Sequence, residues 1–145
     1  MEIYSIGFTK HSASNFFGLL KTHEISNLLD VRLNNSSQLS AFAKRDDLRF
    51  FLGELCDIEY SHTPLLAPVK DLLTSYRKEV ITWSEYEKRF IDLLQDRQIE
   101  NEFDRNVFSK KTVLLCSEHL PEFCHRRLVI EYLDQHWGSV SGIHL

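Results

Sequence analysis

The sequence has little glycine or proline, no excess of basic residues and no long apolar run. Its 145 residues include 5 Gly and 3 Pro, which leaves little room for flexible linkers, so we expect one α/β domain over residues 1–145. The 17 basic and 21 acidic residues give a net charge of -4, which disfavours a nucleic-acid binder that depends on a basic surface. A small anionic ligand is therefore favoured over a long duplex.

Cysteine content and apolar run length indicate the compartment. The three cysteines are an odd number without a secretory leader, so we expect free thiols in a reducing environment. No apolar run approaches the roughly 18 residues that a membrane span requires. We therefore expect a cytoplasmic protein without a membrane partner. The sequence does not indicate an oligomeric state.

Short apolar runs alternate with amphipathic segments along the whole chain. The predicted strands cover residues 3–6, 27–31, 58–63, 112–116 and 140–144. Between them, apolar residues recur at the spacing of one helical face, as in Phe16, Phe17 and Leu20. This alternation predicts an α/β fold, a three-layer sandwich whose mostly parallel central sheet of about five strands is flanked by helices.

Local signals predict where several helices begin. Ser12 is a suitable cap for the first helix. Ser84 and Glu87 have the spacing of a capping box for a later one. Pro121 suits the first turn of the last helix, which would then carry Phe123 on its apolar face.

Polar residues follow several of the predicted strands. In open parallel sheets, ligands bind beyond the carboxyl ends of the strands, near a switch in strand order. The segment 7–11, Asp30 with Arg32, and the segment that begins at Cys116 all follow strand ends. We therefore expect them to converge on one rim of the sheet.

Cys116 ends the predicted strand 112–116 and precedes a polar loop. A thiol at a strand end, facing a helix N-terminus and nearby arginines, has its thiolate form favoured by positive potential. This makes Cys116 a candidate nucleophile. The alternative is a small buried residue that completes the strand, because free cysteine is often fully buried.

The segment Cys124-His125-Arg126-Arg127 places a thiol, an imidazole and two guanidinium groups in succession. His125 is a candidate general acid or base, and Arg126 a candidate for binding phosphate or carboxylate through paired N–H donors. Successive helical residues point about 100° apart, so only one or two of the four can face a common site. Arg127 is expected nearer the buried side. The alternative is a solvated basic turn with one packed cysteine.

A metal site is one alternative, because Cys116, His119, Cys124 and His125 lie close together in the sequence. Their spacing does not match a zinc knuckle or ribbon. Adjacent Cys124 and His125 on one helix would be poorly placed to bind a single ion. We therefore predict no metal ligands. No phosphate-loop or dinucleotide glycine pattern is present either, and we predict no cofactor.

Asp30 and Arg32 flank Val31 and share one side of a strand, because side chains alternate with a period of two. Asp30 is a candidate general base or a partner that orients a histidine. The alternative is a structural salt bridge between Asp30 and Arg32 that fixes the following loop.

Two further strand ends supply weaker candidates for binding. Gly7 and His11 belong to a loop that is a candidate for presenting backbone donors to an anion. Tyr60 shares one face of the strand 58–63 with His62 and is expected to reach the same rim. Packing roles are the alternative for all of these residues.

Together these residues resemble the family called domain of unknown function 488, and the resemblance covers nearly the whole chain. The motifs are Ile6-Gly7 with His11-Ser12, Asp30-Val31-Arg32, Phe42, Tyr60 with His62, Leu115-Cys116-Ser117-Glu118, Pro121 and Cys124-His125-Arg126. The resemblance implies an α/β sandwich with a polar rim at which Glu118 joins the residues named above. It implies no particular reaction.

We predict an enzyme that acts on a small anionic substrate, similar to a phosphate or a nucleotide, at the carboxyl-end rim of the sheet. The catalytic candidates are Cys116, Glu118, His125 and Asp30, and the substrate-binding candidates are Arg32, Arg126, Gly7, His11 and Tyr60. One alternative is a non-catalytic module that binds a nucleotide, nucleic acid or protein. Another is rhodanese-like sulfur transfer through Cys116, although Glu122 stands where an arginine is expected.

Overall fold

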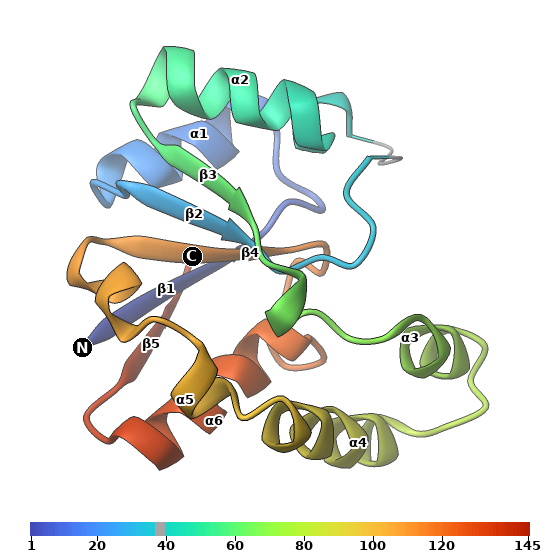
Figure 1. Ribbon diagram of the computed structural model, residues 1–145. Coiled ribbons are helices and arrows are strands. Elements are labelled where there is room, and N and C mark those ends of the chain that lie inside the picture. Colours follow the sequence, from blue (N-terminus) through green and yellow to red (C-terminus); the bar gives the residue numbers. More distant parts are fainter. Residues whose placement is uncertain (37–39) are drawn as a thin grey trace.

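A five-stranded sheet, in which every pair of neighbouring strands is parallel, forms the centre of the computed structural model, which describes residues 1–36 and 40–145 (Figure 1). The strands are β1 (Glu2–Gly7), β2 (Asn27–Asp30), β3 (Glu59–His62), β4 (Thr112–Cys116) and β5 (Ser141–His144). Their order across the sheet is β3-β2-β4-β1-β5. The predicted fold class and the five strands are confirmed.

Helices cover both faces of this sheet (Figure 1). The helices α1 (Ala13–Thr22) and α2 (Arg45–Cys56) lie on one face, and α3 (Lys70–Arg77), α4 (Trp83–Asp96), α5 (Ile99–Glu102) and α6 (His125–Trp137) lie on the other. Each face has its own hydrophobic core, because alternate strand residues such as Leu114 and Leu115 point to opposite sides. Within the described ranges, no helix has the length and apolar character needed to cross a membrane.

The helix starts agree only partly with the capping signals. Ser12 caps α1 as predicted, since its side chain accepts a hydrogen bond from the backbone N–H of Asn15. For α4 the predicted cap is wrong by two residues. Thr82 caps that helix by accepting from the N–H of Glu85, a pair with the same spacing as Ser84 and Glu87.

The last helix begins four residues later than Pro121. Its cap is Cys124, whose backbone is extended (φ -135°, ψ 137°), and His125 is the first helical residue. Residues 121–124 form a turn, in which the N–H of Cys124 donates to the carbonyl of Pro121 over 3.1 Å. The prediction for Phe123 is therefore wrong: this side chain precedes the helix and is 60% exposed.

The loops after β2 and β4 separate at the carboxyl edge of the sheet. The connection from β2 leads to α2 on one face, whereas the connection from β4 leads to α6 on the opposite face (Figure 1). Because β2 and β4 are neighbours, a crevice opens between their ends, as at the switch points of other parallel sheets. Asp30 and Cys116 end these two strands, and Gly7 is paired with Cys116.

Gly7 occupies the closest backbone approach at this edge. A Cβ added to Gly7 would lie 1.6 Å from the carbonyl oxygen of Glu118, which belongs to the loop after β4. Only glycine, which has no side chain, allows the loop to cross the end of β1 at this distance.

We expect the substitution Gly7→Ala to lower the free energy of unfolding by about 3 kcal/mol or more, because the methyl group collides with backbone that has no room to move. Urea denaturation measures this change. The matched control is Gly18→Ala in α1, where a new Cβ meets nothing within 4 Å. That change should stabilise the protein by about 0.5–1 kcal/mol. Equal effects of the two substitutions would contradict the close approach at Gly7.

Candidate functional site

A cavity of about 240 Å³ lies beyond the ends of β2 and β4. Four of the predicted site residues line it: Arg32, Cys116, Glu118 and His125. Cys124 contributes to the same wall. Further lining residues come from the loop after β2, from α3, from the start of α4 and from Phe123, so the cavity joins residues that are far apart in the sequence.

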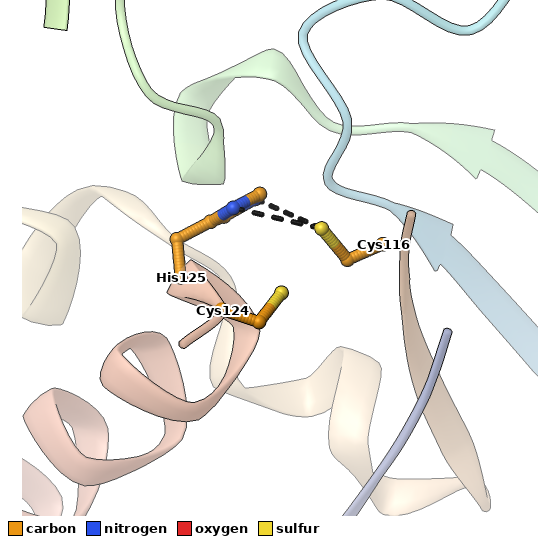
Figure 2. A group of neighbouring side chains, drawn as sticks. All are labelled: Cys116, Cys124 and His125. Carbon is orange, nitrogen blue, oxygen red and sulfur yellow. Dashed lines mark hydrogen bonds between the residues drawn. The ribbon is translucent and has the colours of Figure 1, made fainter. Parts of the chain in front are cut away.

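Cys116, Cys124 and His125 form the most compact group of reactive side chains in the described part of the chain, and we call them the thiol-imidazole centre (Figure 2). All three are buried, and their ligand atoms lie within 4.8 Å of one another. The sulfur of Cys116 is 3.6 Å from Nδ1 of His125. Figure 2 shows both sulfurs on the same side of the imidazole ring.

The ring of His125 is held from its other side. Its Nε2 lies 2.8 Å from the backbone carbonyl of Val31, at the exit of β2. A carbonyl oxygen only accepts hydrogen bonds, so Nε2 carries a proton. In the neutral ring the lone pair is therefore on Nδ1, the nitrogen closest to Cys116.

The two thiols of the centre differ in acidity. A hydrogen bond from Cys124 lowers the pKa of Cys116, and the charge of Arg126 and the backbone N–H groups of Glu118 and Ser117 lower it further, although burial acts in the opposite direction. Burial raises the pKa of Cys124, and its hydrogen bond to Cys116 adds to this. Of the two thiols, Cys116 is therefore the one that ionises more readily.

The late start of α6 allows these side chains to converge. The sequence-based expectation that Cys124 and His125 point apart assumed that both are helical, and this is wrong. Cys124 has an extended backbone and only His125 is in the helix, so their side chains can turn toward the same point. The prediction that no metal binds stays a prediction.

Asp30 and Arg32 form a buried ion pair, of which Arg32 lines the cavity. The guanidinium of Arg32 donates from Nε and Nη2 to the two carboxylate oxygens of Asp30, both over 2.8 Å, and from Nη1 to the carbonyl of Ala43. The side chain of Arg32 is 2% exposed and that of Asp30 is 0% exposed. Burial tends to raise the pKa of Asp30, but hydrogen bonds from Arg32 and Tyr60 hold it below the usual value.

Arg126 is completely buried beneath the loop after β4. It donates to the backbone carbonyls of Glu118 and His119 and, over 3.2 Å, to the hydroxyl of Ser5. Arg127 was expected nearer the buried side, and this is wrong. It is 24% exposed and forms ion pairs with Glu87 and Glu131.

The other predicted binding residues lie away from the cavity wall. Tyr60 donates to Asp30 over 2.6 Å, behind Arg32. Gly7 packs beneath Glu118, and the ring of His11 contacts the ring of His119 edge-on at 5.1 Å. Every nitrogen of the two predicted anion-binding guanidinium groups already donates to a protein oxygen. The roles of these residues in binding stay predictions.

One wall of the cavity was not predicted from the sequence. Tyr76, Trp83 and Tyr86 line it with aromatic rings, and the rings of Trp83 and Tyr86 are stacked at 5.0 Å. Arg77 lines the cavity too, and it is exposed. Within the described residues it forms no ion pair, so its guanidinium is the accessible positive charge of the cavity. An amphipathic pattern alone does not reveal that α3 and α4 fold over the strand ends.

Comparison with known proteins identifies a family. The family model described as Domain of unknown function DUF488 matches residues 12–133 of the chain. This match agrees with the resemblance of the motifs around Asp30, Cys116 and His125. Neither a curated protein nor a solved structure gave a match.

We expect Asp30→Asn to lower the free energy of unfolding by about 3–5 kcal/mol at neutral pH, because it leaves the buried charge of Arg32 unpaired. Urea denaturation tests this, with Asp46→Asn in an exposed ion pair as a control that should change little.

Acidification supplies a second test of the same ion pair. The folded pKa of Asp30 is lowered, so its stabilisation is complete above the unfolded value of about 4 and is lost as the pH falls through the folded value. Asp30→Asn should lack this part of the acid dependence. An unchanged acid profile would contradict the assignment.

Proposed function

The chain belongs to the DUF488 family, and we propose that it is a cysteine-dependent enzyme that acts on a small, ring-containing anionic substrate. The observation that carries this proposal is the position of the Cys116 sulfur. It lines the cavity at the end of β4 and lies 3.6 Å from Nδ1 of His125. A thiol beside an imidazole is the usual arrangement of a nucleophile and its proton-transfer partner.

The reaction begins when Nδ1 of His125 takes the proton of the Cys116 thiol. The sulfur gives its electron pair to an electrophilic atom of the substrate, and the bond to the leaving group breaks. Nδ1 of His125 gives its proton to the leaving group. The neutral ring then takes a proton from the water that hydrolyses the bond to sulfur and returns it to the released thiolate, which restores the starting state. Val31 keeps the ring oriented through both steps.

The electrostatics of the centre support a thiolate at this position. Cys116 ends a strand opposite the N-terminus of α6, where backbone N–H groups favour negative charge. The buried guanidinium of Arg126 lowers the pKa of Cys116 further. These groups are built into the fold and therefore require no rearrangement when substrate arrives.

The shape and lining of the cavity support the proposed substrate class. Tyr76, Trp83 and Tyr86 offer aromatic faces against which a planar ring can stack. A volume of about 240 Å³ is small beside the roughly 300–1,000 Å³ of sites for larger ligands, so one ring system with one anionic group is the expected size. We assign the anionic group to Arg77, because Arg32 and Arg126 are committed to protein oxygens.

Alkylation by iodoacetamide tests the nucleophile. At pH 7 we expect Cys116 to be modified faster than Cys56, because its lowered pKa gives it the larger thiolate fraction at that pH. Cys56 is the matched control: it is partly buried on α2, outside the cavity, and burial raises its pKa. Peptide mass spectrometry separates the two rates. If Cys116 reacts no faster than Cys56, it is not the nucleophile.

Tryptophan fluorescence tests the substrate class. The chain has two tryptophans, and only Trp83 lines the cavity. Uridine 5′-monophosphate and adenosine 5′-monophosphate should each quench the emission of the wild-type protein and of Trp137→Phe. Neither should quench the emission of Trp83→Phe. Ribose 5-phosphate, which has no aromatic ring, should have no effect. Arg77→Gln should weaken binding by about tenfold or more, because it removes a charged hydrogen-bond donor. Arg89→Gln, in an exposed ion pair of α4, is the matched control. Equal weakening by both substitutions would exclude Arg77 as the anion site.

A further inference from the structure

We propose that Cys116, Cys124 and His125 also form a binding site for a zinc ion, with the fourth coordination position open to the cavity. The site goes beyond the proposed reaction and does not depend on it. Two thiolates and one imidazole are a known set of three protein ligands for zinc with an open position. Thiolate and imidazole ligands favour zinc over magnesium or calcium, which prefer oxygen.

The spacing of the donor atoms fits a tetrahedral ion. Zinc–sulfur and zinc–nitrogen bonds of about 2.3 and 2.0–2.1 Å place a sulfur and a nitrogen of the same ion about 3.5 Å apart, and two sulfurs about 3.8 Å apart. Cys116 Sγ and His125 Nδ1 are already 3.6 Å apart. Since all three donor atoms lie within 4.8 Å of one another, a change of at most about 1.3 Å in a sulfur–nitrogen pair, or about 1 Å in the sulfur–sulfur pair, brings them onto one ion.

The surroundings of His125 are those of a metal-binding histidine. Such a histidine usually donates its second ring N–H to a carbonyl or a carboxylate, which fixes the tautomer and the orientation of the ring. Here Nε2 donates to the carbonyl of Val31 over 2.8 Å. Nδ1 is thereby left without a proton and can accept a metal ion, and the two sulfurs lie on one side of the ring (Figure 2).

Burial and charge favour the binding of a zinc ion by these three residues. The three side chains are between 2% and 6% exposed, so water screens the centre poorly. A zinc ion with two thiolates and a neutral imidazole has no net charge, which reduces the cost of burying the ligands. All three residues line the cavity, so the ion has an entry path and its fourth position can take water or a ligand.

Zinc and substrate then compete for the same sulfur. When Cys116 coordinates zinc, its electron pair is no longer available for attack on a substrate. The centre therefore has a metal-free state with a free thiolate and a zinc-bound state in which that thiolate is protected. This consequence, unlike the site itself, rests on the proposed function: removal of zinc would activate the proposed enzyme, and supply of zinc would inhibit it.

Metal analysis of the full-length protein tests the site. Protein stripped with a chelator, reloaded with zinc and passed through a desalting column should retain one zinc ion per chain. Reloading with cobalt should produce the thiolate-to-cobalt charge-transfer band and the visible bands of a tetrahedral ion. Cys124→Ser and Cys124→Ala should lose the retained zinc and the charge-transfer intensity, whereas Cys56→Ser should keep both. Circular dichroism checks that each variant is folded.

The outcomes separate the zinc site from the proposed reaction. Bound zinc should slow alkylation of Cys116 without changing that of Cys56. Retention of zinc by both Cys124 variants, or its loss from Cys56→Ser as well, would overturn the proposed site. The reactivity of Cys116 is measured on metal-free protein, so slow alkylation there would reject the nucleophile and leave the zinc result intact.

Discussion

The buried guanidinium of Arg126 is the interaction on which the rest of the site depends. It lies on α6 and donates to two carbonyls of the loop after β4 and to Ser5 on β1, so it joins three segments. Within the described residues it forms no ion pair with a carboxylate. A buried cation without an opposite charge is costly, and the charge of Arg126 lowers the pKa of the Cys116 thiol. The same charge that stabilises the loop therefore favours the reactive form of the cysteine.

The loop held by Arg126 also explains which features the sequence could predict. Strand β4 was predicted with its observed limits, because a short apolar run with β-branched residues and a following polar loop is a local signal. The rim was predicted for a similar reason, since the carboxyl ends of parallel strands meet at one edge. Pro121 was misleading, because proline is as common in turns as in the first turn of a helix. A turn and a helix start at Pro121 are distinguished only by the contact of Arg126 with the backbone of residues 118 and 119.

The aromatic wall of the cavity could not be predicted from the sequence, for a different reason. Tyr76, Trp83 and Tyr86 follow an ordinary helical pattern, and nothing near them in the sequence indicates that α3 and α4 pack over the ends of β2 and β4. The pairing of Asp30 with Arg32 was foreseen, but not the extent of its burial, which determines whether a guanidinium can contact a ligand. Burial of this kind depends on segments that are distant in the chain.

The arrangement of the three arginines resolves a difficulty of the proposed reaction, in which a thiolate must attack a substrate that is itself negatively charged. Repulsion between two like charges would be strong in a poorly solvated cavity. Arg126 lies beneath Cys116 and offsets the thiolate, whereas the charge of Arg32 is already neutralised by Asp30. Arg77 lines the same cavity and is exposed, so it is available to the anionic group of the proposed substrate. A zinc ion bound to the thiol-imidazole centre would offset the negative charge of the two sulfurs in place of Arg126. In the metal-free state, separate cations for the nucleophile and for the substrate allow both negative charges to occupy one small cavity.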